Sequence, residues 1–309
     1  MRIAALAGGV GGAKFLLGLT QAMDPKDITV IANTGDDIVV HGLMVSPDPD
    51  IITYTLGGVV NPETGWGFAG ESFTVLNRLK TYGHQTWFQL GDRDLATHIH
   101  RTAMLAAGAR LSEVADSIRT GLGVEAKILP MSDQPVRTML DTDQGWLHLQ
   151  EYLVQRRAEP VIRAIRFDGL ESALPAPGVM EALDHADAII LCPSNPLISI
   201  GPILAVPGIR ERLRERRDDV VAISPLVGGK ALKGATDKMM RELGLEATTR
   251  GIARLYRDVA GTLVIDSADE ADAPHVIREN MKAVIRPTIM TNMADKERLA
   301  RDVLALIVT

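Results

Sequence analysis

A glycine-rich loop between a strand-like segment and a helix-like segment is the feature that most constrains this chain. Residues 2–7 form a short apolar run, residues 8–12 read Gly-Gly-Val-Gly-Gly, and the helix-like stretch covers residues 13–23. Such a loop brings backbone N–H groups to the positive end of a helix, where phosphate groups bind. The alternative is a tight turn that only lets the helix pack closely on a sheet. The residues predicted to bind a nucleotide phosphate here are Gly9, Gly11, Gly12 and Lys14.

The loop matches neither of two common nucleotide-binding motifs. Lys14 is not followed by Ser or Thr, and its spacing differs from that of a Walker A loop. Gly9 and Gly11 fit the dinucleotide pattern G-x-G-x-x-G, but Lys14 occupies the position of the third glycine. This departure weakens the case for an NAD-dependent oxidoreductase.

Composition narrows the class of protein. The chain has 309 residues, of which 46% are hydrophobic and 23% charged, the balance of a globular protein. A net charge of -6 without a long basic run argues against nucleic acid as a partner. Cys192 is the only cysteine, which excludes an intramolecular disulfide and a cysteine-rich zinc site, and its apolar surroundings predict a buried side chain.

Two further observations predict a cytoplasmic protein. No signal peptide follows Met1, because the chain leads directly into a short strand and a polar loop. No apolar stretch reaches the roughly 18 residues of a membrane span.

Strand-like and helix-like segments alternate along the chain. We therefore predict an α/β protein with a Rossmann-like, mostly parallel sheet and helices on both faces. The strand-like segments are 2–7, 28–32, 86–90, 124–129, 188–192, 220–224 and 262–265. Ligands bind at the carboxyl ends of such strands, so the loops that follow them should gather along one edge.

Residues 130–177 show a different pattern. Residues 147–152 and 161–167 alternate in the manner of antiparallel strands. We expect one α/β domain over residues 1–309, and leave open an inserted, lid-like α/β subdomain at about 130–177.

Residues 46–50 read Ser-Pro-Asp-Pro-Asp and predict a stiff, extended segment, because each proline holds the preceding residue extended. Side chains two apart then point to the same side, so Asp48 and Asp50 would repel each other unless a cation lay between them. Mg²⁺ prefers carboxylate oxygens and bridges to phosphates. Asp48 and Asp50 are the predicted metal ligands, with a solvated turn as the alternative.

Other polar loops supply further candidates. Residues 33–37 follow the second strand, and there Asn33 and Thr34 are preferred over the two aspartates as nucleotide contacts. Arg93 lies between two aspartates that could cap a helix, and its fork suits a phosphate. Loops after the strands ending at residues 192 and 224 add a second set of predicted nucleotide contacts. They are Ser194, Asn195 and Lys230.

Two other kinds of chemistry find little support. His98 and His100 fall in a helix-like segment, where residues two apart lie about 200° from each other, which disfavours a shared zinc ion. The chain has no Gly-x-Ser-x-Gly elbow, and no histidine is placed as the base of a nucleophilic triad. Transfer of a phosphate-linked group, which depends on positioning and charge neutralisation, fits the remaining candidates.

Taken in order, several blocks of the chain resemble the CofD/FbiA family. The resemblance runs from the first strand to the last third of the chain. Its blocks are GGVGGAK (8–14), NTGDD (33–37), SPDPD (46–50), LGDRDLATH (90–98), PMSD (130–133), PSNP (193–196) and SPLVGGK (224–230).

The resemblance implies a Mg²⁺-dependent transferase of coenzyme F-420 biosynthesis with a Rossmann-like sheet, typically a homodimer. Such an enzyme moves a phospholactyl or phosphoenolpyruvyl group from a guanosine-diphosphate-activated donor to the 5′-hydroxyl of the deazaflavin Fo, and GMP leaves. Its deazaflavin contacts fall on Asp50 and Gln89, the latter at a position that also carries basic residues in the family.

Combined with the residue chemistry, this assigns the predicted roles. Asp48, Asp50 and Arg93 are the catalytic candidates, with Arg93 and Lys230 offsetting charge on the phosphates. The residues predicted to contact the deazaflavin are Asp50, Gln89, Asp92 and Trp66. The main alternative is a regulator of the YvcK type, which would bind a nucleotide or nucleotide-sugar without turnover.

Overall fold

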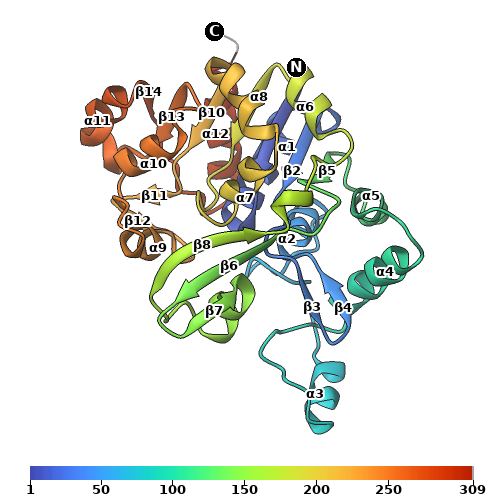
Figure 1. Cartoon of the computed structure of the whole chain (residues 1–309). Helices are drawn as coiled ribbons and strands as arrows, with labels where there is room; N and C mark the ends of the chain where they lie inside the picture. The colour runs from blue at the N-terminus through green and yellow to red at the C-terminus, as the bar shows by residue number, and fades with distance from the viewer. Residues whose placement is uncertain (308–309) are drawn as a thin grey trace.

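The computed structural model describes residues 1–307 and confirms the predicted α/β class (Figure 1). Its centre is a seven-stranded sheet in the order β14-β13-β10-β9-β1-β2-β5, in which every neighbouring pair is parallel. The strands are β1 (Ile3–Ala7), β2 (Ile28–Ala32), β5 (Lys127–Pro130), β9 (Ala188–Leu191), β10 (Val220–Ile223), β13 (Thr262–Ile265) and β14 (Lys282–Ile285).

Helices cover both faces of this sheet because its strands are apolar on both sides. Along β1, Ile3 and Ala5 pack into one buried cluster, and Ala4 and Leu6 pack into the other. The first cluster includes side chains of α1 (Gly9–Ala22), α2 (Pro47–Leu56) and α12 (Met293–Leu304). The second includes α6 (Val179–His185), α7 (Ile200–Ala205), α8 (Ile209–Glu215), α10 (Thr249–Tyr256) and α11 (Ala273–Arg278).

The strand order reverses direction at β1. From β1 the chain runs outward to β2 and β5 on one side, whereas β9 pairs with the other side of β1 and leads outward to β10. The loops after β1 and β9 therefore leave the sheet in opposite directions, which opens a crevice at their carboxyl ends. The fold thus places the glycine loop and the loop after β9 next to each other.

Within residues 130–177, residues 137–168 hold the antiparallel strands that the alternation predicts. β6 (Arg137–Thr142), β7 (Gly145–His148) and β8 (Ile162–Asp168) make a three-stranded sheet in the order β7-β6-β8. A helical segment at Glu151–Gln155 and α9 (Thr236–Glu242) pack with it in a separate buried cluster. Whether this region acts as a lid or a subdomain stays a prediction.

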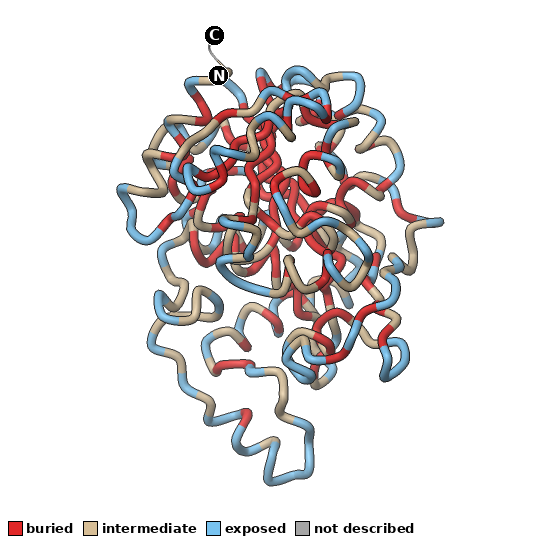
Figure 2. Tube along the Cα trace, turned by 90° about the vertical axis from the view of Figure 1, so that its left-hand side faces the viewer, coloured by how far each residue is buried: buried red, intermediate tan, exposed pale blue. Residues whose placement is uncertain are grey.

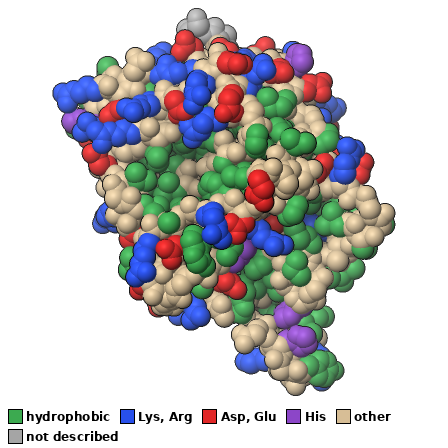
Figure 3. All heavy atoms as spheres, in the orientation of Figure 1, with side chains coloured by type: hydrophobic (Ala, Val, Ile, Leu, Met, Phe, Trp, Pro, Cys, Tyr) green, Lys and Arg blue, Asp and Glu red, His purple; other side chains and the backbone are tan. Residues whose placement is uncertain are grey.

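An arm extends away from the sheet between α2 and α4 (Asp94–Ala106), and it projects from the rest of the molecule in all three whole-chain views (Figures 1, 2 and 3). It contains α3 (Thr74–Thr81), whose residues are mostly exposed, and leads into α4, which α5 (Leu111–Gly121) follows. Two short hairpins complete the fold, β3 (Ile38–Val40) with β4 (Leu43–Val45) and β11 (Leu226–Val227) with β12 (Lys230–Ala231).

The predicted strand at residues 86–90 is wrong. This segment is irregular, and no sheet pairs with it. Only Leu90 is fully buried, in a small cluster with the β3–β4 hairpin, so the apolar residues reflect local packing and not a ladder. Sequence reasoning also missed several elements of the fold, namely α2, α7, α10, α11 and β14.

Cys192 and the length of the helices bear on two further predictions. Cys192 is a free, buried cysteine, as its surroundings predict. Across residues 1–307, none of the helices has both the length and the apolar character needed to cross a bilayer.

We expect Gly11→Ala to destabilise the protein by about 1–3 kcal/mol, the usual range for overpacking. A Cβ at Gly11 would lie 2.4 Å from the Pro193 carbonyl oxygen, so α1 and the loop after β9 would have to separate. Gly121→Ala, in α5, is the matched control, because its Cβ would meet no atom within 4 Å. It should stabilise the helix by up to about 1 kcal/mol. Urea unfolding measures both, and equal effects of the two variants would contradict this packing.

Candidate active site

A cavity of about 620 Å³ opens at the carboxyl ends of β1 and β9. Its walls come from the glycine loop, the first turns of α2 and α4, the loop after β9, residues 149–154 and residues 232–236. The expectation that the loops gather at one edge is confirmed for most of them. The segment at residues 89–94 also reaches the cavity, although it follows no strand.

The predicted boundary between the glycine loop and the helix is wrong, because α1 begins at Gly9 and not at residue 13. The glycine loop is therefore largely the first turn of α1, and it packs tightly against two neighbouring segments. The Ser194 hydroxyl accepts a hydrogen bond from the Gly8 N–H at 3.2 Å and donates to the Gly8 carbonyl at 2.7 Å. A Cβ at Gly8 would lie 2.2 Å from Asp48 Oδ2, and one at Gly12 would lie 2.6 Å from Ser194 Oγ. The glycines therefore permit the close approach and leave the first N–H groups of α1 at the cavity.

Asp48 holds this helix end in place. Its Oδ1 accepts a hydrogen bond from the Gly9 N–H at 2.7 Å, and its Oδ2 accepts one from Asn33 Nδ2 at 2.9 Å. Burial raises the pKa of Asp48 to about 6, against the opposing effect of these two bonds. One carboxylate thus joins α1, α2 and the end of β2.

The expected extended conformation of residues 46–50 is wrong, because residues 47–50 form the first turn of α2. Pro47 occupies a first-turn position, where the missing N–H has no intrahelical partner and the fixed φ suits a helix. Residues two apart on a helix lie about 200° from each other, so Asp48 and Asp50 face different neighbours.

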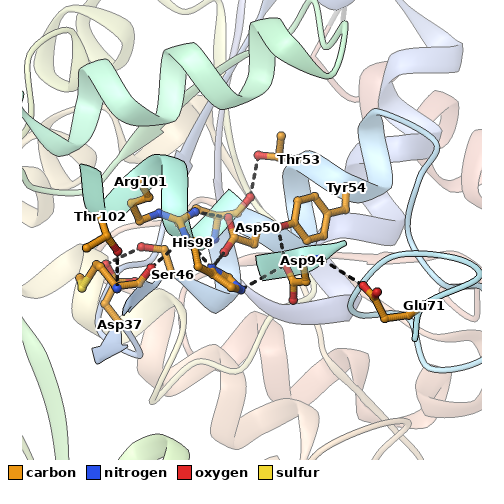
Figure 4. A network of polar contacts seen from close by, with 12 residues as sticks. Asp37, Ser46, Asp50, Thr53, Tyr54, Glu71, Asp94, His98, Arg101 and Thr102 are labelled. Atoms are coloured by element: carbon orange, nitrogen blue, oxygen red, sulfur yellow. Dashed lines mark hydrogen bonds and ion pairs between the residues drawn. The ribbon is translucent and has the colours of Figure 1, made fainter. Parts of the chain in front are cut away.

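Asp50 belongs to a second polar network, between α2 and α4 (Figure 4). It forms a buried ion pair with Arg101, whose Nη1 also lies 3.0 Å from His98 Nδ1. On the far side of the imidazole, His98 Nε2 lies 3.2 Å from Asp94 Oδ1, which accepts a hydrogen bond from the Tyr54 hydroxyl at 2.6 Å. Burial raises the pKa of Asp50, and the Arg101 charge opposes that shift.

Two more buried carboxylates follow β2. Asp36 Oδ2 accepts a hydrogen bond from Gln150 Nε2 at 3.0 Å, and Asp37 Oδ2 accepts one from the Ser46 hydroxyl at 2.8 Å. Burial raises the pKa of both, and the charge of Asp48 raises that of Asp36 further. Asp36 lines the cavity, and its Oδ1 has no hydrogen-bond partner within residues 1–307.

Nine of the predicted site residues line the cavity. They are Gly9, Gly11, Lys14, Asp48, Asp50, Trp66, Gln89, Ser194 and Asn195. The cavity lining does not include Gly12, Asn33, Thr34, Asp92, Arg93 or Lys230.

Three of the six residues outside the cavity lining form hydrogen bonds with other parts of the protein. Asn33 is fully buried and donates to the Ile198 carbonyl as well as to Asp48. Asp92 accepts hydrogen bonds from the N–H groups of Thr74 and Val75 and so caps α3. Arg93 donates to the Ala69 carbonyl at 2.8 Å. Direct contact with a ligand in the cavity would require Arg93 to leave this position.

Several residues that line the cavity were not among the predicted site residues. Lys233, in the same loop as Lys230, donates to the Thr64 carbonyl, and burial together with the charge of Lys14 lowers its pKa. Tyr54, Asp94 and His98 also line the cavity. The spacing of Asp94 and His98, four residues apart on a helix-like segment, was a usable signal for that pair.

Metal-binding chemistry is limited in this arrangement. In the described part of the chain, no three or more His, Cys, Asp and Glu side chains are grouped to hold a metal ion. His98 and His100 lie on α4, as the sequence suggests, and His100 pairs with the Ser117 hydroxyl instead. Any divalent cation here would need fewer protein ligands together with oxygens from a bound substrate.

The cavity lies at the switch point of a parallel sheet and combines a glycine loop at a helix N-terminus with two lysines and buried carboxylates. This combination is typical of α/β proteins that bind phosphorylated ligands. The chain matches the sequence profile of the family described as 2-phospho-L-lactate transferase CofD over residues 3–305, and it belongs to that family of transferases.

Relatives match over nearly the whole chain. A phosphoenolpyruvate transferase of Streptomyces griseus is 46% identical, covering 99% of this chain and 98% of its own. A 2-phospho-L-lactate transferase of Methanopyrus kandleri is 38% identical with the same coverage. A crystal structure of a UPF0052-family protein from Bacillus halodurans has a TM-score of 0.61 at 17% identity, covering 100% of this chain and 98% of that one, and shares the fold.

We expect Asp48→Asn to reduce the pH dependence of stability. The pKa of Asp48 rises from 3.8 to about 6 on folding, so the folded state holds a proton that the unfolded state has lost between these values. Stability therefore falls as pH rises from about 4 to 6, by on the order of 3 kcal/mol for this group. Asparagine removes that contribution.

Urea unfolding at pH 4 and pH 7 measures the effect as the difference between the two free energies of unfolding. Asp116→Asn, a change to an exposed side chain on α5, is the control and should leave the difference unchanged. A difference as large in Asp48→Asn as in the wild type would contradict the burial of a charged Asp48.

Proposed function

We propose that the protein transfers a phosphoenolpyruvyl or phospholactyl group from a guanosine-diphosphate-activated donor to the 5′-hydroxyl of the deazaflavin Fo, in coenzyme F-420 biosynthesis. The family and the names of the relatives support the transfer. The main structural support for the donor site is the N-terminus of α1, which lines the cavity. Asp48 and Ser194 fix this helix end by accepting hydrogen bonds from the N–H groups of Gly9 and Gly8. Resemblance to the family supplies the identities of donor and acceptor.

The donor diphosphate fits the part of the cavity next to α1. The N–H groups of the first helical turn, including those of Val10 and Gly11, have no partner inside the helix and attract anions. Lys14 and Lys233 add positive charge at the same cavity. Ser194 and Asn195 lie beside this region and suit the guanosine portion of the donor.

The acceptor fits the part of the cavity next to Asp50. Phe88, Gln89 and Trp66 line the same cavity as Asp50, which provides apolar and aromatic surface for a flat ring system. In the transfer, the 5′-oxygen of Fo forms a bond to the phosphorus of the phosphoacid. The bond from that phosphorus to the bridging oxygen breaks, and GMP leaves with that oxygen. Asp50 orients the hydroxyl and accepts its proton.

A magnesium ion fits two of the carboxylates at this cavity. Asp48 and Asp36 both line it, the charge of Asp48 raises the pKa of Asp36, and Asp36 Oδ1 has no hydrogen-bond partner in the described chain. Two carboxylates plus phosphate oxygens are a usual Mg²⁺ environment. We therefore propose Asp36 beside Asp48 in place of the predicted pairing with Asp50, which faces Arg101. Mg²⁺ would supply positive charge to the diphosphate oxygens.

Purified protein incubated with Fo, Mg²⁺ and the guanylyl-activated phosphoacid tests the proposed function. We expect release of GMP and a phosphodiester-linked product, both seen by liquid chromatography with mass spectrometry. Binding of the nucleotide without any product would contradict a transferase and favour the YvcK-type regulator. A homodimer and a cytoplasmic location stay predictions.

Lysine variants test the donor site. We expect Lys14→Met and Lys233→Met each to raise the KM for the donor about tenfold or more, equivalent to roughly 1.4 kcal/mol of lost binding. Lys26→Met is the control, because Lys26 is exposed and pairs with Glu125 away from the cavity. Unchanged KM values in both cavity variants would contradict the assignment of the diphosphate to this end.

A further inference from the structure

Asp50 is buried and contacts two side chains of α4. Its Oδ1 is paired with Arg101, and its Oδ2 lies 3.8 Å from His98 Nδ1. Oδ2 is buried and has no hydrogen-bond partner within the described residues, and Asp50 lines the cavity. A carboxylate that is fixed in this way at a cavity wall is suited to accept a hydrogen bond from a substrate hydroxyl in a defined direction.

Arg101 pairs with this carboxylate but does not reach the cavity. Its side chain is 2% exposed and does not line the cavity, so it acts on a ligand only through Asp50. One terminal nitrogen, Nη2, pairs with Asp50, and the other, Nη1, lies 3.0 Å from His98 Nδ1 and donates to the Met44 carbonyl at 3.3 Å. These contacts hold both ends of the planar fork, which fixes its orientation.

The neighbouring imidazole has a defined tautomer. Arginine nitrogens only donate, so His98 Nδ1 must accept, and the ring proton lies on Nε2. Nε2 faces Asp94 Oδ1 at 3.2 Å, and the Tyr54 hydroxyl donates to the same oxygen. A line of contacts therefore runs from Tyr54 through Asp94, His98 and Arg101 to Asp50 (Figure 4).

We propose that Arg101 and His98 are positioning residues, which hold Asp50 in the rotamer that presents its carboxylate to the acceptor hydroxyl. The inference rests on the proposed role of Asp50 in the transfer. The opposing interpretation is an ion pair that only joins α2 to α4. Misplacing a reacting group by about 1 Å can lower a rate 100-fold, whereas a purely structural pair affects stability alone.

Kinetics of Arg101 variants separate the two interpretations. Arg101→Met should lower kcat about 100-fold while the KM for the donor changes less than about twofold, because Arg101 does not line the cavity in which the diphosphate is proposed to bind. Arg101→Lys keeps the charge but loses the fork, so we expect an intermediate kcat. Arg119→Met is the matched control on α5, where Arg119 pairs with Asp116. It should leave kcat unchanged.

Two rescue measurements guard against a variant that simply fails to fold. Arg101→Ala should regain activity with added guanidinium but not with methylammonium, since only the former has separate nitrogens that can donate to Asp50 and to His98. His98→Asn offers an acceptor near the position of Nδ1 and should retain more kcat than His98→Leu. Full kcat in folded Arg101→Met, or equal kcat in both His98 variants, would overturn the proposal.

A crystal structure of Arg101→Lys and of His98→Leu tests positioning without any turnover. We expect the Asp50 side chain to leave its wild-type rotamer in at least His98→Leu or Arg101→Lys, and an unchanged Asp50 in both would overturn the inference. A wild-type protein that yields no product would instead refute the proposed function, so the two failures are distinguishable.

Discussion

The hydrogen bonds of Asp48 are the interaction on which the rest of the site depends. A single buried carboxylate accepts from the N–H of Gly9 at the start of α1 and from the side chain of Asn33 at the end of β2. Because Asp48 itself belongs to the first turn of α2, these bonds fix three elements relative to one another. The negative charge also lies at the positive end of the α1 dipole, which stabilises it there.

In the same region, the carboxylates outnumber the positively charged side chains that pair with them. Asp36, Asp37, Asp48 and Asp50 are all buried, and burial raises the pKa of each. Arg101 pairs with only one of them directly. Such a site is unfavourable for stability when empty and favours a cation, which suits an enzyme that must hold a diphosphate beside carboxylates. Instability of this kind is a common feature of functional sites.

The overall architecture could be predicted from the sequence because it follows from local patterns. Apolar strands and the glycine loop predicted the parallel sheet and its ligand-binding edge, and nine predicted residues line the cavity. Prediction failed where a choice depended on tertiary contacts. Pro47 and Pro49 fit an extended segment as well as a helical first turn, and only the contacts of α2 select the helix.

Residues far apart in the sequence account for the other failures. Lys230 and Lys233 stand in one loop, and only the path of the β11–β12 hairpin decides which of them reaches the cavity. The sequence alone makes Arg93 a candidate phosphate ligand, whereas in the fold Arg93 donates to the carbonyl of Ala69 in the arm. Arg101 gave no sequence signal, because its partner Asp50 lies on another helix.

A crystal structure with GDP and Mg²⁺ would show where the donor diphosphate binds. We expect the diphosphate to accept hydrogen bonds from the backbone N–H groups of the first turn of α1, with Lys14 and Lys233 nearby and the metal held by Asp48. A diphosphate bound elsewhere, with the first turn of α1 unoccupied, would contradict the proposed donor site.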